Sequence, residues 1–352
     1  MRTRPYHFLA LIGILTLISG CGQKDNGVPK RRGQFTPANI TLKEHGALKE
    51  LVDESLTFVD SSGVKWIAPK GTLTDGASVP RLALTITNGQ WDAQFLKAAV
   101  VHDAYCQQDN DTRNPDQWRK QSWKVVHKMF YEASIAGGTS QLLANLMYAA
   151  VLLAGPRWDD PEGEKMAEVS SDALTRAFGG SKEWIEHNNP TVEEIEQDID
   201  RREPLLHDLY KLETAILTIL GDRKLNTKKL DALLRDEEAV LAQALAKLPA
   251  DLMVLNFKGY WHKNRAILYD ESKRDAEKNK ELIDSERTFK SVIARAPEDP
   301  SALNGLGSVS IMRGDLDDAE KHILKALAIA PNYQEAKHDL QLIKVLRNKS
   351  VK

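Results

Sequence analysis

The chain has 352 residues, of which 42% are hydrophobic and 28% are charged, and its formal net charge at pH 7 is -2. This length suffices for two domains with separate hydrophobic cores. The nearly neutral balance, with basic residues spread along the chain, excludes the strongly basic surface that is typical of nucleic-acid-binding proteins. We therefore expect no nucleic-acid partner.

The N-terminus has the layout of an export signal. Two arginines precede an apolar run over residues 8–18, which is shorter than the ~20 apolar residues of a membrane-spanning helix. The run leads to Gly20 and Cys21, and this end resembles the signal of bacterial lipoproteins. The resemblance implies a signal peptide over residues 1–20, a lipid on Cys21 that attaches the chain to a membrane, and a place in the bacterial cell envelope, facing the periplasm or the outside. An uncleaved signal anchor is the alternative.

Residues 21–36 are polar, basic and rich in glycine, which predicts a flexible tether after the signal. With a lipid on Cys21, Cys106 is the only thiol left, so no internal disulfide can form. Cys106 is then either sheltered in apolar surroundings or present for its reactivity.

Residues 37–160 predict an α+β domain with a small β-hairpin and three helices. Alternating apolar residues on both sides of a turn at residues 61–63 predict the hairpin. The stretch KGTLTDGASVPR that follows is rich in turn-forming residues, so we expect Asp75 and Ser78 to lie in an irregular loop. Apolar residues at helical spacing predict three helices, over residues 92–107, 117–134 and 140–154. The last of these is almost wholly apolar, so we expect it to be buried.

Beyond residue 160 the composition becomes charged and helical, which predicts an all-α region. We assign residues 161–189 to a linker and residues 190–250 to an antiparallel helical hairpin. Residues 251–352 resemble tetratricopeptide repeats, a family of helix pairs that stack into a solenoid. One copy matches the 34-residue pattern at Leu303, Leu306, Gly307, Ala319, Ile323, Ala326 and Pro331.

A second copy lies one period earlier. Its second helix carries equivalents of four residues of the first copy, at Ser285, Phe289, Val292 and Pro297. Its first helix, with Leu255 and Gly259, lies about fourteen residues too far upstream, so we expect longer helices or an inserted turn. Because about three repeats are needed for stability, the hairpin at 190–250 is expected to join the same solenoid. The concave surface of a solenoid implies a partner protein or peptide.

Several segments of the first domain resemble the bacterial and phage family called domain of unknown function 1353. They are APKGTLTDGASVPR, AAVVHDAYC, and HKMFYEASIAGG with MYAAVLLAGPRW, in that order. The resemblance covers about residues 36–160 and implies a fold region without an established activity.

A second resemblance concerns chemistry. The helix with His102 and Asp103, followed by the segment HKMFYEA with His127, is similar to the two catalytic helices of bacterial phospholipase A2 enzymes. It implies a metal-dependent hydrolase in which His102 activates a water and Asp103 holds Ca²⁺. Apart from the resemblance, Asp75 in the preceding loop is a candidate for a further oxygen ligand. The chain differs from this pattern because His127 replaces the aspartate that orients the imidazole, and Cys106 replaces a tyrosine.

The same residues are also candidate ligands of Zn²⁺. His102 and Cys106 lie four residues apart on one helix face, and His127 is expected on the facing side of the next helix. Asp103 or Asp75 would complete the set. A nucleophilic pair of Cys106 and His102 is another possibility.

A purely structural role is the remaining interpretation of these residues. A histidine and a cysteine on an apolar helix face are often packed and hydrogen-bonded. Asp103 would then pair with Arg113 or Arg119.

Two functions follow from the sequence. The first is a lipid-anchored scaffold or assembly factor that binds a partner protein through its repeats. The alternative is a hydrolase, dependent on Ca²⁺ or Zn²⁺, in which His102 and His127 are the catalytic residues, with His102 as general base.

Overall fold

A computed structural model describes residues 33–75, 93–158, 160, 166, 168–222 and 224–350. Cys21, most of the predicted tether and Ser78 lie outside these residues. Within them, no helix combines the length and the apolar character that a membrane span needs.

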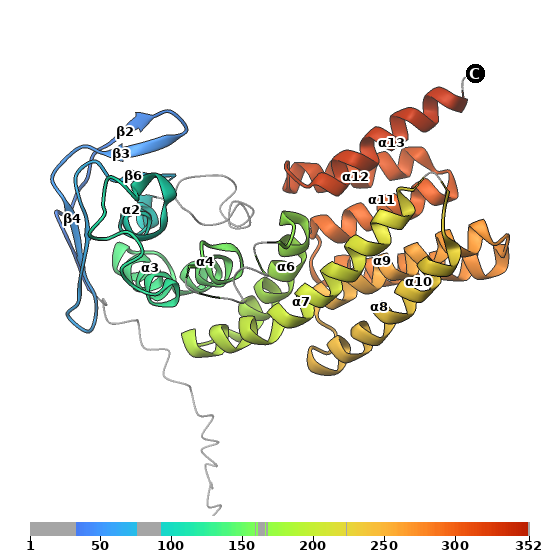
Figure 1. The fold of residues 1–352 in the computed structure, drawn as a ribbon, viewed down its shortest axis with the longest axis horizontal. Helices are drawn as coiled ribbons and strands as arrows, with labels where there is room; N and C mark the ends of the chain where they lie inside the picture. Colours follow the sequence, from blue (N-terminus) through green and yellow to red (C-terminus); the bar gives the residue numbers. More distant parts are fainter. Residues whose placement is uncertain are drawn as a thin grey trace, which may run out of the picture. The chain divides into compact units, whose positions relative to one another are not determined.

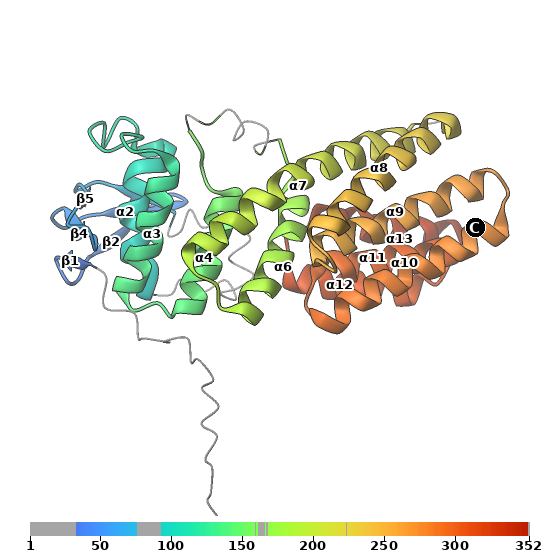
Figure 2. The same cartoon turned by 90° about the horizontal axis from the view of Figure 1, so that it is seen from below.

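Six short strands form two antiparallel sheets (Figures 1 and 2). One sheet has the strand order β1–β4–β5, with bounds Gln34–Thr36, Leu56–Val59 and Lys65–Ala68. The other has the order β2–β3–β6, with bounds Leu42–His45, Leu48–Leu51 and Leu73–Thr74. Strands β4 and β5 pair with Phe58 opposite Trp66, which confirms the predicted hairpin. Strand β6 lies where an irregular loop was expected, and that prediction is wrong for Leu73–Thr74.

Three helices complete this part of the chain, namely α2 (Ala93–Cys106), α3 (Trp123–Gly137) and α4 (Gln141–Ala154). Helix α2 packs on β4, β5 and β6 with one side and on α3 with another. The Ser140 side chain accepts from Leu143 N and so caps α4, whose residues 144–153 are all buried. The predicted central helix is therefore confirmed.

Helix α3 begins six residues later than the predicted Gln117. Residues 117–122 form turns and a bend, and Arg119 has a φ of 53°, which a right-handed helix does not accommodate. Polar side chains just before them bind β6 and the residue that precedes it. The Asn110 side chain donates to Leu73 O at 2.8 Å and accepts from Leu73 N at 2.9 Å, and Asn114 donates to Thr72 Oγ1 at 2.9 Å. Asparagine side chains of this kind compete with helix formation.

The remainder of the described chain is helical, so an α+β part is followed by an all-α part, as predicted. The helices are α6 (Ser171–Asn188), α7 (Val192–Leu220), α8 (Thr227–Lys247), α9 (Leu252–Glu271), α10 (Asp275–Arg295), α11 (Pro300–Arg313), α12 (Leu316–Ile329) and α13 (Gln334–Ser350). Helices α9 and α10 have 20 and 21 residues, against 14 each in α11 and α12. The expected lengthening of the earlier pair is confirmed.

We predicted a linker over residues 161–189, but most of this range forms α6, so the prediction is wrong there. Ala173, Ala177, Phe178 and Ile185 of this helix are at most 3% exposed, and they join the same core as the strands and α4. Helix α6 packs against α4 and α7 as well as α9 (Figure 2). It is thus a central element of the fold.

A buried guanidinium on α6 connects three further helices. The Arg176 side chain is fully buried, and its Nη1 donates to both carboxylate oxygens of Glu213 on α7 at 2.7 and 2.8 Å. Its Nη2 donates to Glu335 on α13. The same guanidinium lies 4.8 Å from the ring of Phe257 and 4.7 Å from that of Tyr260, both on α9.

The first turn of α6 also caps α13. The Asp172 carboxylate accepts from Gln334 N at 3.2 Å and from Glu335 N at 2.9 Å. A carboxylate at a helix N-terminus satisfies otherwise unpaired amides and complements the positive end of the helix dipole.

Replacing Arg176 with methionine is expected to lower the free energy of unfolding by about 3–5 kcal/mol, because Glu213 loses its buried partner. Chemical denaturation of the purified chain measures the change. The matched control is Arg201→Met on α7, whose side chain is 56% exposed and should cost about 0–1 kcal/mol. Equal effects of the two changes would contradict this account.

Glu335 makes this contact dependent on pH. Burial raises its pKa to about 7, and Glu213 and Asp172 act in the same direction, whereas Arg176 opposes them. Because the folded-state pKa exceeds the ordinary value of 4.5, the protonated acid is favoured on folding. Its stabilising contribution is complete below pH 4.5 and is lost as the pH rises through about 7.

We therefore expect the Glu335→Gln chain to lose less stability than the wild type when the pH is raised from 4.5 to about 7. Thermal unfolding at a series of pH values measures the difference. Glu238→Gln, at an exposed position of α8, should leave the wild-type pH profile unchanged. A Glu335→Gln profile parallel to that of the wild type would refute the assignment.

Candidate functional site

The candidate residues of α2 and α3 lie together in the interior. His102, Asp103 and Cys106 on α2 and His127 on α3 are each at most 2% exposed. The predicted helix faces explain this placement, because Phe95, Ala99, His102 and Cys106 are all buried, as are Trp123, His127, Phe130 and Ser134. The two helices are neighbours, as the sequence interpretation requires.

The two imidazoles are in direct contact. His102 Nε2 and His127 Nδ1 are 2.9 Å apart, a hydrogen-bond distance at which one ring donates and the other accepts. The ring centroids are 5.1 Å apart and the ring planes are inclined by 32°. His127 therefore occupies the Nε2 side of His102.

Asp103 and Cys106 lie on the other nitrogen of His102. Asp103 Oδ1 and Cys106 Sγ are each 3.3 Å from His102 Nδ1. The thiol also donates to His102 O at 3.3 Å, the carbonyl one helical turn before it, and Sγ is 3.7 Å from Nε2. One possible ligand atom from each of these three residues lies within 4.8 Å of the others.

Thr74 of β6 orients the aspartate. Its hydroxyl donates to Asp103 Oδ2 at 2.6 Å, and Asn110 donates to the Asp103 carbonyl at 2.8 Å. If Asp103 had a purely structural role, we expected it to pair with Arg113 or Arg119, but these arginines make other contacts. Arg113 donates to Gly71 O at 3.3 Å, and the guanidinium of Arg119 stacks on Trp118 at 4.3 Å.

The surroundings of His127 keep its ring neutral. Burial lowers its pKa well below the ordinary value, and its electrostatic interactions with His102 and Arg157 act in the same direction. The Pro156 backbone acts in the opposite direction. The ring packs against Trp123 and Trp158, with centroids 5.5 and 6.4 Å away.

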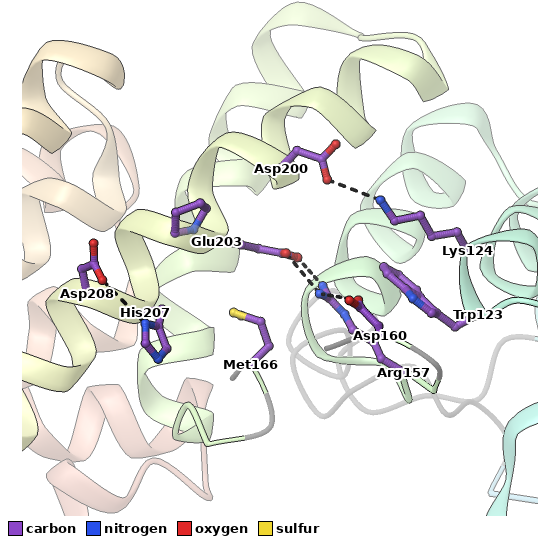
Figure 3. Close-up of a pocket in the computed structure, with 10 residues that line it drawn as sticks. Trp123, Lys124, Arg157, Asp160, Met166, Asp200, Glu203, His207 and Asp208 are labelled. Carbon is purple, nitrogen blue, oxygen red and sulfur yellow. Dashed lines mark hydrogen bonds and ion pairs between the residues drawn. The ribbon is translucent and has the colours of Figure 1, made fainter. Parts of the chain in front are cut away.

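A separate cavity lies beside this cluster, between α3 and α7 (Figure 3). Its volume is about 530 Å³, and Trp123 and Met166 line it together with ion-paired side chains. Arg157 donates to Glu203, and Lys124 lies 3.7 Å from Asp200, so both pairs join the first domain to α7. Trp123, which lines the cavity, also contacts His127 of the histidine cluster.

The sequence interpretation and the structure differ in which residues form the cluster. His127 contacts His102, but it does not share the space in which Asp103 and Cys106 meet. Asp75 directly follows Thr74 and is half-buried, but it does not belong to the described group of possible metal ligands. Thr74 was missed, although its place in the TDGASVP segment beside Asp75 was a usable signal.

The cluster lies in a segment of the chain that matches a known protein family. Residues 51–151 match the family described as protein of unknown function (DUF1353). This match confirms the resemblance to domain of unknown function 1353, over a shorter range than the sequence motifs suggested. Thr74, His102, Asp103, Cys106 and His127 all fall inside it.

Two curated relatives come from Sinorhizobium fredii (strain NBRC 101917 / NGR234). The uncharacterized protein y4iH is 37% identical over 112 residues, which is 32% of this chain and 43% of the relative. The uncharacterized protein y4jT is 34% identical over 107 residues, which is 30% of this chain and 29% of the relative. The chain thus spans less than half the length of these relatives. No solved structure matches it.

Replacing Thr74 with valine is expected to lower the free energy of unfolding by about 1.5–3 kcal/mol, because a buried carboxylate loses one donor while the side-chain shape is kept. Chemical denaturation measures the change. Thr218→Val on α7, at an exposed position where the hydroxyl binds only Thr214 O, should change stability by less than about 0.5 kcal/mol. If the two variants unfold alike, the Thr74 contact carries no special weight.

Proposed function

We propose that the chain is a lipid-anchored protein of the bacterial cell envelope that acts as a scaffold or assembly factor. The lipid would be attached at Cys21, and the partner protein would bind the C-terminal helices. The supporting observation is the repeated packing of helix pairs, which resembles tetratricopeptide repeats.

The same close contact recurs in two successive helix pairs. A Cβ atom at Gly307 of α11 would lie 2.6 Å from the Ile323 side chain of α12. A Cβ atom at Gly259 of α9 would lie 2.5 Å from the Phe289 ring of α10. Glycine is required at both positions because the second helix of each pair approaches closely. These are the residues that the repeat pattern makes equivalent, so the packing supports the repeat assignment.

The partner surface is best sought away from α6. Helix α6 contacts α9 and α11 and caps α13, so it already covers the first helix of both pairs and the start of the last described helix. On the last described helix, Leu342 and Val345 are 37% and 50% exposed and lie three residues apart on one face, while Ile343 is buried. The terminal helix of a repeat array usually has a polar outer face. We assign the partner-binding surface to Leu342 and Val345.

Replacing both Leu342 and Val345 with glutamate is expected to weaken partner binding by about 2 kcal/mol or more, because a buried charge replaces apolar contact. Chemical crosslinking in the producing cells, followed by purification from the membrane fraction, measures the partner adduct. Gln341→Glu, at an exposed neighbouring position, is the control and should keep the adduct. An adduct that survives the double change would contradict the surface assignment.

Replacing Cys21 with serine should release the chain from the membrane fraction. A chain that stays in the membrane fraction after this change would contradict the lipid anchor.

A metal-dependent hydrolase with His102 as general base is the second candidate. The 2.9 Å contact between His102 and His127 favours it, since His127 occupies the place of the orienting residue. Both nitrogens of His102 have close neighbours, however, and no side chain of the cluster is more than 2% exposed. Hydrolysis of an ester that needs His102 and added Ca²⁺ or Zn²⁺ would establish this function.

A further inference from the structure

Arg119, in the connection between α2 and α3, differs from the other arginines of the described chain because it has no carboxylate partner there. Each of the other described arginines has an aspartate or glutamate oxygen at 3.9 Å or less. Arg119 is partly exposed, so its terminal nitrogens can be reached from solvent. Its charge is therefore available to a ligand.

The backbone holds Arg119 in an unfavourable conformation. Its φ of 53° lies in the left-handed region, which a residue with a Cβ atom rarely adopts. The Arg119 amide donates to Tyr105 O at 2.9 Å, which fixes the residue against the end of α2. Backbone strain of this kind persists where the surrounding structure imposes it, and it is concentrated at ligand sites. The conformation thus favours a functional role for Arg119.

Two tryptophan rings pack on the guanidinium. Its Cζ atom lies 4.3 Å from the ring centroid of Trp118 and 5.8 Å from that of Trp158. Trp158 is itself fixed, because it is 5% exposed and its Nε1 donates to Gln121 O at 2.8 Å. Stacking uses the face of a planar guanidinium, so its N–H groups still point outward along its edge. The rings therefore hold Arg119 in place and leave its donors available.

This cluster of Trp118, Arg119 and Trp158 offers donors without matching acceptors. Trp118 Nε1 and Arg119 Nε are buried, and neither has an acceptor among the described residues. Buried donors without acceptors are costly and uncommon in folded proteins. An indole N–H and a guanidinium can only donate, so the group that complements them is an acceptor with negative charge. Lys120, the next residue, is exposed and adds a second positive charge.

We propose that Arg119 is the centre of a binding site for a phosphate monoester. The edge of a guanidinium donates two parallel hydrogen bonds to two oxygens of one oxyanion. A phosphate monoester carries about −1.5 to −2 charges at pH 7, which matches the two positive charges of Arg119 and Lys120 better than a carboxylate does. The stacked guanidinium keeps this geometry before the ligand binds, which a lysine cannot do. The site depends neither on the proposed scaffold role nor on the hydrolase candidate.

Titration with inorganic phosphate, followed by NMR, tests the site. Because Trp118 stacks on Arg119, its indole N–H signal reports on a group bound there. The full-length chain is labelled with nitrogen-15 and titrated at constant ionic strength, and Trp118→Phe identifies the signal. We expect phosphate to shift this signal to saturation, and acetate, with its smaller charge, to bind more weakly.

Arg119→Asn separates binding from folding. Asparagine adopts left-handed backbone more readily than arginine, so this change removes the guanidinium without adding strain. The variant should keep the wild-type thermal midpoint and lose the saturable shift. Arg235→Asn, at a side chain that is 68% exposed on α8, changes the net charge equally and should bind phosphate as the wild type does.

Three results would overturn the proposal. They are the absence of a saturable shift in the wild type, phosphate binding by the Arg119→Asn chain that equals that of the wild type, and an equal loss of binding in the Arg235→Asn chain. Acetate binding as tightly as phosphate would overturn the choice of a phosphate ligand. The wild-type titrations decide between these results even if Arg119→Asn fails to fold.

Discussion

The burial of Arg176 is the constraint on which the helical part of the structure depends. A guanidinium without water is tolerated only when carboxylates and ring faces replace its hydration. Here the carboxylates come from Glu213 and Glu335, and the ring faces come from α9. Helices far apart in sequence must therefore assemble around one side chain of α6.

Small residues let α6 approach the other helices closely. A Cβ atom at Gly180 would lie 2.5 Å from Arg202 Nη1 and 2.8 Å from Asp251 Oδ1. Arg202 is itself buried and pairs with Asp198 at 2.6 Å and with Asp251 at 2.7 Å, and Asp251 caps α9. The close approach thus connects a second charged network to α6, and each buried charge has an opposite charge beside it.

These features explain why the sequence predicted the other helices but missed α6. The predicted helices have long apolar stripes or a clear start, as α7 has in its capping box of Thr191 and Glu194. Helix α6 instead carries Gly179, Gly180 and a charged face, a composition typical of a linker. The partners of its buried polar residues lie on other elements, from Asp198, 17 residues from Ser181, to Glu335, 159 residues from Arg176. Local pattern holds no information about such contacts.

The candidate site shows the same division between local and distant information. Helical spacing placed His102 and Cys106 on one face, and the resemblance to catalytic helices brought His127 opposite them. Neither could show which nitrogen of His102 each neighbour would contact, because that depends on ring orientation. The role of Thr74 depends on β6 packing against α2, and that strand was expected to be a loop.

The candidate site lies in one part of the chain, the segment that matches the family, and not in the helices that follow it. Thr74, the α2 residues and His127 all lie within residues 51–151, the segment that matches the family. The two relatives align over 112 and 107 residues, which is about a third of this chain. Helices α6 to α13 lie beyond residues 51–151. The buried cluster around His102 is thus confined to the segment that resembles the family, and its neighbours can be understood without the helices that follow.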